Sequence, residues 1–559
     1  LEIVVRTPDG AATPARITVL CEDICPYPPT SQEQDVTFEY LPQGWAAVAW
    51  AGVDGKVSLG LVPGDYRVVV SRGMEWSVWP PDASQTNGFA VSLSPDEPVR
   101  LEAEIARVLD TTGALSADFH VHAIGSQDSS VPQIERVLSF LAEGVDVIVS
   151  TDHDIITDYA PAIEALGAGE EIRSIIGNEV TTSILGHFNA FPLVRDPDHR
   201  RGGALDWGAG GERVMTPAEI FAWARSWPGE QVVQINHPNF SIFTYADVLR
   251  GLSYGDPVLW RIDVPAPDPA TGDTGLWSDD FTALEVMNGH SLDRFWGTAR
   301  WWLTLVGRGH TPTATAVTDT HRRYSNTLGG VPRTFIFVPE ETDTPASFEL
   351  ASFVAAVNQG TAVGTNGPFL RVRATAGDGQ GATLGEVIST GGEPVEVEIV
   401  IEHADWMRVD HLDVYMNVDD VITLPGEFEE TPLIPTQTHA LVWNEEDIEV
   451  VASGLHEHRR YRKTITVTLE SAVDAYVIFI VRSDESNSMF SVVPGTELGA
   501  FAFTNPLYLD ADGGGYDNPH LAELARTPPP YVAPLRSSEK DKLTDEDIEK
   551  AFEGLHCSH

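Results

Sequence analysis

The sequence predicts a mixed α/β protein in which a parallel α/β barrel is flanked by two β-sandwich domains. Between residues 113 and 366, short apolar runs of strand length alternate with amphipathic helical segments. Nearly every one of these runs ends in a His, Asp or Glu residue, and parallel barrels carry their chemistry at that end of the strands. The segments before and after this region consist of strand patterns separated by Gly- and Pro-containing turns, which is typical of sandwiches.

Residues 1–112 are expected to form the first sandwich. Strand patterns cover residues 15–20, 57–61, 66–71 and 99–106, and a turn signal at 62–65 separates the second from the third. The stretch GKVSLGLVPGDYRVVVSRG resembles the carboxypeptidase-regulatory-like, transthyretin-like sandwich. None of its residues suggests catalysis.

The strand-like runs of the barrel region form an ordered series. His120 and His122 alternate on the first run and therefore point to one face of a strand. Helical patterns at 131–142 and 216–227 fill two of the gaps. The other runs, each given with its metal-competent residues, are 145–150 (Asp152, His153), 172–176 (Glu179), 186–191 (His187), 231–235 (His237), 281–287 (His290) and 313–317 (Asp319, His321).

Each of these residues also has a purely structural interpretation. His153 or His187 alone fits a buried core histidine, and Asp128 fits a solvated loop carboxylate. Together on one rim, however, they predict a metal site, with His290 outside the ligand set. The predicted ligands are His120, His122, Asp128, His153, Glu179, His187, His237, Asp319 and His321. A mixed nitrogen and oxygen ligand set suits Zn, Mn or Fe without distinguishing among them.

The amino-acid sequences of the motifs resemble those of a known superfamily. FHVH with a following S.D, then STDHD, GNEVTT, GHFN, NHP and TDTH are similar to the PHP (polymerase and histidinol phosphatase) superfamily of metallohydrolases. They look most like its carbaryl-hydrolase (CehA/McbA-type) branch. The resemblance covers roughly residues 114–366 and implies a distorted (β/α)7 barrel that holds two or three divalent metal ions.

Carried over by position, the resemblance implies three metal sub-sites. Glu179 would bridge the first two metals. The spacing between the His-x-His pair and Asp128 is one residue longer than we expect from the family. The implied sets are His120, His122, Glu179 and Asp319; Glu179, His187 and His237; and Asp128, His153 and His321.

A hydroxide shared by two such metals near Glu179 is the expected nucleophile. We expect Asp152 to orient a ligand or a strand end, because ligating histidines usually have such partners. Arg322 or Arg323 either stabilises a developing oxyanion or is a surface cation. The superfamily implies phosphoesters and the branch implies carbamate or carboxylic esters, so the scissile bond stays open. Several aromatic residues would line an apolar pocket or belong to the core: Trp207, Phe240, Phe243, Tyr245, Trp296, Trp301 and Trp302.

The alternative is a non-catalytic carbohydrate- or surface-binding protein with a degenerate barrel, whose function the sandwiches would carry. The complete ligand series argues against it.

The chain of 559 residues contains 83 acidic and 35 basic residues, a formal net charge of −48. Such a surface repels nucleic acid and anionic membranes. A solvated soluble surface is the preferred explanation of this charge, and salt adaptation is the other. We therefore expect a small-molecule ester substrate; the oligomeric state stays open.

The remaining expectations concern the ends of the chain. Three cysteines, Cys21, Cys25 and Cys557, do not suggest a disulfide scaffold, although the first two are close enough to pair. No apolar run has transmembrane length. The missing initial Met and the sandwich flanks favour an exported protein, whether periplasmic, lipid-anchored or secreted.

Residues 367–510 are expected to form the second sandwich, with strands at 369–374, 395–402, 411–417, 463–469 and 475–481. Asp510, Asp512 and Asp517 stand among glycines and form either a calcium site or a plain turn. The tail, 511–559, would contain one short helix at 545–553 that starts at Thr544.

Overall fold

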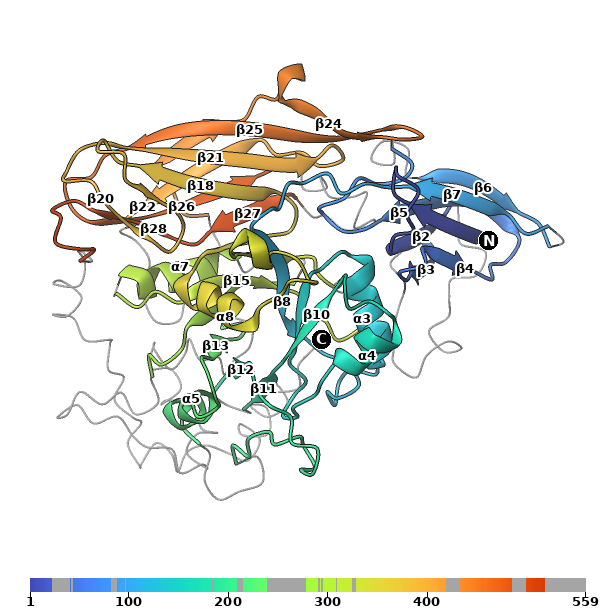
Figure 1. The fold of residues 1–559 in the computed structure, drawn as a ribbon, viewed down its shortest axis with the longest axis horizontal. Helices are drawn as coiled ribbons and strands as arrows, with labels where there is room; N and C mark the ends of the chain where they lie inside the picture. Colours follow the sequence, from blue (N-terminus) through green and yellow to red (C-terminus); the bar gives the residue numbers. More distant parts are fainter. Residues whose placement is uncertain are drawn as a thin grey trace, which may run out of the picture.

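The structure is a computed structural model. It describes residues 1–22, 41, 44–81, 88–95, 97–182, 185–208, 215–238, 278–289, 292, 295–307, 309–323, 328–418, 432–484 and 499–517. The predicted tail helix, His290, Phe240, Phe243 and Tyr245 lie outside these residues. Figure 1 shows the N-terminal strands to one side, the C-terminal strands as a long layered body, and the metal-competent region below that body.

The N-terminal region contains two small sheets that share one apolar core. The first sheet contains β4 (Lys56–Ser58), β1 (Glu2–Arg6) and β7 (Arg100–Glu104). The second contains β3 (Trp45–Ala51), β2 (Ala15–Cys21), β5 (Gly64–Ser71) and β6 (Phe89–Leu93). Alternate residues of β1 and β2, such as Ile3, Val5, Ile17 and Val19, meet in the core between them.

The region that carries the predicted ligands is mixed α/β, with its strands divided between two sheets. β8 (Ala114–Val121), β9 (Val147–Ser150) and β10 (Arg173–Ile176) pair in parallel. The second sheet contains β11 (Asn178–Thr181), β12 (His187–Phe191), β13 (Val232–Ile235), β14 (Ala283–Asn288) and β15 (Thr313–Val317). These strands confirm the apolar runs read from the sequence.

Helices connect several of these strands. α3 (Gln133–Ala142) and α5 (Pro217–Arg225) lie where the sequence predicts helices, and α4 (Ala160–Ala165), α7 (Phe295–Gly307) and α8 (Leu350–Gln359) add to them. α5 begins with a capping box, because Thr216 accepts the Glu219 N–H while the Glu219 carboxylate accepts the Thr216 N–H. α8 ends at Gly360, whose φ of 79° suits glycine.

The expected distorted (β/α)7 barrel does not form as one closed sheet among the described residues. β11, β12 and β13 pair antiparallel, whereas β13, β14 and β15 pair in parallel. Isolated bridges join the two sheets, one between Val121 and Thr320 and one between His153 and Glu179. The carboxyl ends of β8, β9 and β15 therefore still meet at one place.

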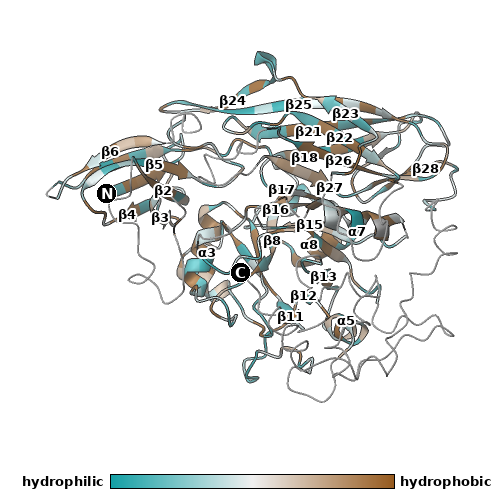
Figure 2. Cartoon of the chain, turned by 180° about the vertical axis from the view of Figure 1, so that it is seen from behind, coloured by the Kyte–Doolittle hydropathy of each residue, from teal (hydrophilic) through white to brown (hydrophobic). Residues whose placement is uncertain are grey.

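The C-terminal strands form two layers, and one layer continues into the metal-competent region. The separate layer contains β19 (Gly381–Ala382), β18 (Phe369–Thr375), β21 (Val395–Ala404), β25 (Glu457–Leu469) and β24 (Ile448–Ser453). The other contains β20 (Val387–Ser389), β28 (Leu507–Asp510), β26 (Ala475–Arg482), β22 (His411–Met416), β23 (Gln437–Ala440) and β27 (Phe501–Thr504). β26 is buried along almost its whole length and is strongly apolar (Figure 2).

That second layer crosses the expected domain boundary near residue 366. β27 pairs with β17 (Ala362–Thr365), which pairs with β16 (Arg333–Phe337), which pairs with β8. The strand that carries His120 and His122 therefore belongs to the same sheet as the C-terminal sandwich. This continuous hydrogen bonding anchors the candidate site to a large apolar core.

The predicted aromatic residues divide between core and partly buried positions. Trp302 belongs to α7 and is fully buried, and its Nε1 donates to the Pro312 carbonyl at 3.0 Å. Trp207 and Trp301 are also buried, whereas Trp296 is partly buried against the same core. Within the described residues, no helix is long and apolar enough to cross a membrane.

Candidate metal centre

β8 brings the first two predicted ligands to one point. All its residues are buried, and the period of the strand directs His120 and His122 to the same side. Their Nε2 atoms lie 3.1 and 3.3 Å from Oδ1 of Asp319, which follows β15. The three residues therefore offer two imidazoles and a carboxylate to one ion.

The loop after β8 is shaped by a close approach to Asp152. A Cβ atom on Gly125 would lie 2.5 Å from Oδ2 of Asp152, so only glycine fits there. Oδ1 of Asp152 accepts the Ala123 N–H at 2.7 Å and the Ser126 hydroxyl at 3.0 Å. Ser126 Oγ lies 2.8 Å from Nδ1 of His122. Asp152 thus hydrogen-bonds to the loop whose Ser126 contacts His122, and its positioning role stays a prediction.

Glu179 lies at the centre of the cluster and is fully buried. Its carboxylate faces five imidazoles. The separations are 3.3 Å to His120 Nε2, 3.6 Å to His122 Nε2, 2.5 Å to His153 Nδ1, 3.1 Å to His187 Nδ1 and 3.5 Å to His237 Nε2. A carboxylate with two oxygens in this position is suited to bridging two cations.

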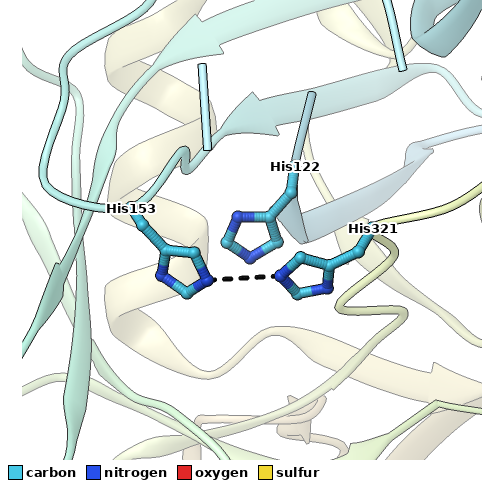
Figure 3. A group of neighbouring side chains, drawn as sticks. All are labelled: His122, His153 and His321. Atoms are coloured by element: carbon cyan, nitrogen blue, oxygen red, sulfur yellow. Dashed lines mark hydrogen bonds between the residues drawn. The ribbon is translucent and has the colours of Figure 1, made fainter. Parts of the chain in front are cut away.

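A further group gathers on the outer side of His122. The rings of His122 and His321 stack at 4.0 Å between centroids, and Nε2 of His153 lies 3.2 Å from Nε2 of His321 (Figure 3). Oδ2 of Asp128 lies 3.1 Å from His153 Nε2 and 3.2 Å from His321 Nε2. The structure therefore brings Asp128 together with both histidines of the third implied set.

Mutual interactions among these groups shift their pKa values. Burial alone would raise the pKa of Glu179, but the imidazoles of His153, His120 and His187 outweigh it and hold that pKa well below its ordinary value. Burial, followed by the neighbouring His321 and His153, lowers the pKa of His122. The shift of His122 favours the neutral imidazole, which is the form that binds metal. For His120 and His153, burial lowers the pKa, but the neighbouring carboxylates outweigh it and raise both pKa values well above the ordinary value.

Three inward-facing atoms lack hydrogen-bond partners. Nε2 of His120, Nε2 of His122 and Oε2 of Glu179 are buried and have no hydrogen-bond partner among the described residues, although charged groups lie close to them. His153 Nδ1 comes within 2.5 Å of Glu179 Oε2, but this contact does not have hydrogen-bond geometry. Buried polar atoms without partners are costly, and a metal ion would satisfy all three at once. The donor set therefore fits divalent metal ions.

Sequence reasoning missed Glu285, which lies in β14 and is buried. Its Oε1 is 2.5 Å from Nδ1 of His120, and its Oε2 accepts the His237 N–H at 2.6 Å. Gln234 and Asn288 also donate to this carboxylate. The available signal was a charged residue inside an apolar run, where an unpaired carboxylate is costly.

Backbone strain also concentrates at this site. Apart from Asn417, the described non-glycine residues with positive φ are Asp154 (52°), His237 (25°) and Asp319 (51°). Each adjoins or belongs to the ligand series. L-residues adopt such angles at a cost of about 1–3 kcal/mol each and do so mainly at functional sites.

Of the two predicted arginines, Arg323 pairs with an acidic side chain of α3. Arg323 Nε lies 2.5 Å from Oε2 of Glu135, so its guanidinium is held by an ion pair on α3. Arg322 is half-buried, and its carbonyl accepts a hydrogen bond from Arg136 at 2.9 Å. A role of the Arg322 side chain in the chemistry stays a prediction.

The aspartates near the C-terminal end of the described chain stabilise a turn by accepting backbone hydrogen bonds. Oδ1 and Oδ2 of Asp510 accept the N–H groups of Gly513 and Gly515, and Asp512 accepts that of Gly514. Asp517 follows this turn, and its N–H donates to Asp474. These bonds match the turn interpretation, and the calcium site stays a prediction.

Comparisons with known proteins give little further guidance. No family model matches the chain, and no curated protein matches it. Among solved structures, it is similar to a two-domain protein from Bacteroides vulgatus described as containing a predicted PHP-like metal-dependent phosphoesterase. The match has a TM-score of 0.31 and 16% identity, and it covers 70% of this chain and 95% of that one. At this level of likeness, function has to be argued from the residues themselves.

Proposed function

We propose that the chain is a metal-dependent hydrolase with a multinuclear centre that cleaves an ester-type bond in a small molecule. The observation that carries this proposal is the buried Glu179 carboxylate, which lies within 3.6 Å of five imidazoles. A charge buried so deeply is costly unless cations share it. The motif resemblance to the PHP superfamily, including its distorted (β/α)7 barrel, is part of this proposal.

The ligand groups support more than one ion. Ligand atoms of His120, His122 and Asp319 lie within 4.8 Å of one another, as do those of His153, Glu179 and His187. The groups of His120, Glu179 and His237 and of His122, His153 and His321 satisfy the same limit. Because Glu179 belongs to two of these groups, we assign it the bridging role.

Bound divalent ions would lower the pKa of water towards neutrality and polarise the substrate oxygen. The residues of the chain supply the rest. Glu285 holds His120 with Nδ1 towards the carboxylate, so that Nε2 faces the centre. Asp152 holds the Ser126 loop, and Ser126 in turn orients His122 and hydrogen-bonds the backbone N–H of His153. We assign Arg322 to an anionic oxygen of the substrate.

The substrate class within this proposal is an ester: a phosphoester by the superfamily resemblance, or a carbamate or carboxylic ester by the carbaryl-hydrolase resemblance. Zn, Mn and Fe all suit the ligands. We also propose export from the cytoplasm, because Cys21 is disulfide-bonded and disulfides persist in oxidising compartments. The net charge of −48 disfavours nucleic acid as a partner.

A substrate screen tests the proposal. Protein stripped with chelator and reloaded with Mn²⁺ or Zn²⁺ would be assayed on aryl phosphate, aryl acetate and aryl carbamate esters. We expect metal-dependent hydrolysis of at least one ester class, lost in the stripped protein. Fewer than one bound transition-metal ion per chain after reloading would contradict the proposal and favour a non-catalytic binding protein.

A further inference from the structure

A second cluster of metal-competent side chains lies between the N-terminal sheets and the C-terminal sandwich. β24 and β25 form a hairpin whose tip reaches the N-terminal region (Figure 1), where Leu455 N–H donates to Oε1 of Glu104 at 2.6 Å. Glu104 ends β7. His456 lies directly before β25, and His458 is the second residue of that strand.

The tip of the β24–β25 hairpin lies very close to Glu104 of the N-terminal region. A Cβ atom on Gly454 would lie 2.4 Å from Oε1 of Glu104, so the carboxylate rests directly on the backbone of the hairpin tip. Oε1 of Glu104 lies 3.3 Å from Nε2 of His458 and 3.9 Å from Nδ1 of His456. The two imidazole centroids are 4.3 Å apart.

We propose that Glu104, His456 and His458 form a second divalent-metal site, with three protein ligands, that fastens the β24–β25 hairpin to the N-terminal sandwich. One ligand atom from each residue lies within 4.8 Å of the others. Tetrahedral zinc with bonds of about 2.0–2.1 Å places its ligand atoms about 3.3 Å apart. The Glu104–His458 separation already has this value, whereas Nδ1 of His456 lies 3.9 Å from Oε1 of Glu104.

The polar partners of the three residues favour a cation. Among the described residues, Glu104 has no Arg or Lys within ion-pair distance, although its side chain is only 10% exposed. Nε2 of His456 is buried and has no hydrogen-bond partner in the described part of the chain. A metal ion between the carboxylate and the two imidazoles would neutralise Glu104.

His458 is held in an orientation suitable for a ligand. Its Nδ1 lies 2.8 Å from Ser77 Oγ, which also accepts the Ala106 N–H at 3.0 Å. If Nδ1–H donates to Ser77, Nε2 turns a lone pair towards the Glu104 carboxylate, and a cation between the two acceptors removes their repulsion. In the other tautomer Nε2–H donates to Glu104, and His456 Nε2 still lacks a partner.

Zinc binding by the full chain tests the site. Chelator-stripped wild type, His456→Ala and the matched control His439→Ala would be dialysed against Zn²⁺ and the bound zinc measured. His456 is the suitable target because its side chain is partly exposed and lies at a hairpin tip. His439 lies on β23 of the same sandwich.

We expect His456→Ala to bind one zinc ion fewer per chain than wild type and His439→Ala, with unchanged ester hydrolysis. We also expect the rise in melting temperature on adding Zn²⁺ to be smaller in His456→Ala than in the other two proteins. Equal zinc content and an equal thermal response in all three proteins would overturn the proposal, as would an equal loss in both variants. This comparison does not depend on the central cluster around Glu179. If that cluster bound no zinc, its zinc would be missing from wild type and from both variants alike.

Discussion

Nδ1 of His120 lies 2.5 Å from Oε1 of Glu285, and both side chains are fully buried. This contact fixes which nitrogen of His120 faces the centre, because Nε2 then points towards Glu179 and Asp319. A histidine held in this way by a carboxylate has a defined ring orientation and is a stronger ligand.

Glu285→Gln should therefore weaken metal binding. Loss of such a supporting carboxylate typically costs 10–100-fold in metal affinity, and we expect a decrease of about that size. Competition with a chelating dye measures the affinity. Glu341→Gln, an exposed change on the short 3-10 helix Glu340–Thr342, is the control. Equal affinity in both variants would show that His120 is oriented by other contacts.

Asp128 should contribute to only one metal position. It contacts His153 and His321, and its side chain is 35% exposed, unlike the buried Glu179. We expect Asp128→Asn to lose about one metal ion per chain and to retain the ions held around Glu179. Elemental analysis checks this, with the exposed Asp198→Asn as control. Loss of all metal in Asp128→Asn would mean that the positions are not separable.

His403 should make the C-terminal sandwich sensitive to acid. Burial lowers the pKa of His403 to about 4, outweighing its hydrogen bond to the Ala404 carbonyl. Between this value and the ordinary value of 6.5, the unfolded state binds more protons, so stability is complete above pH 6.5 and falls as the pH drops towards 4. The loss attributable to this group is about 3 kcal/mol at most.

His403→Phe removes the titrating group while keeping an aromatic ring to stack on Tyr461, whose centroid lies 5.0 Å away. We expect its melting temperature to decline less than that of wild type between pH 6.5 and pH 4. Identical slopes in the two proteins would refute the assignment.

The sequence alone predicts much of this site because its ligands follow apolar runs of strand length. His120, His153 and Asp319 lie at the ends of β8, β9 and β15, where the predicted runs end. Such local patterns predict strands because each strand must bury its apolar side chains.

What the sequence does not predict is pairing over long distances. Glu285 was missed because its partner His120 is 165 positions away. The pairing of β17 with β27 and the contact of Glu104 with His458, which are 354 positions apart, leave no local pattern. The antiparallel pairing of β12 with β11 and with β13 could not be predicted either. An apolar run shows that a segment is a strand, but it does not specify which strand lies beside it.

The bridging role of Glu179 is the central claim, and Glu179→Gln tests it most directly because it keeps the shape of the side chain and removes its charge. Metal content and ester hydrolysis would be measured side by side for wild type, Glu179→Gln and the exposed control Glu164→Gln. We predict that only Glu179→Gln loses hydrolysis by orders of magnitude and at least one bound metal ion, while the fold survives. Near-normal hydrolysis with wild-type metal content in Glu179→Gln would contradict the bridge.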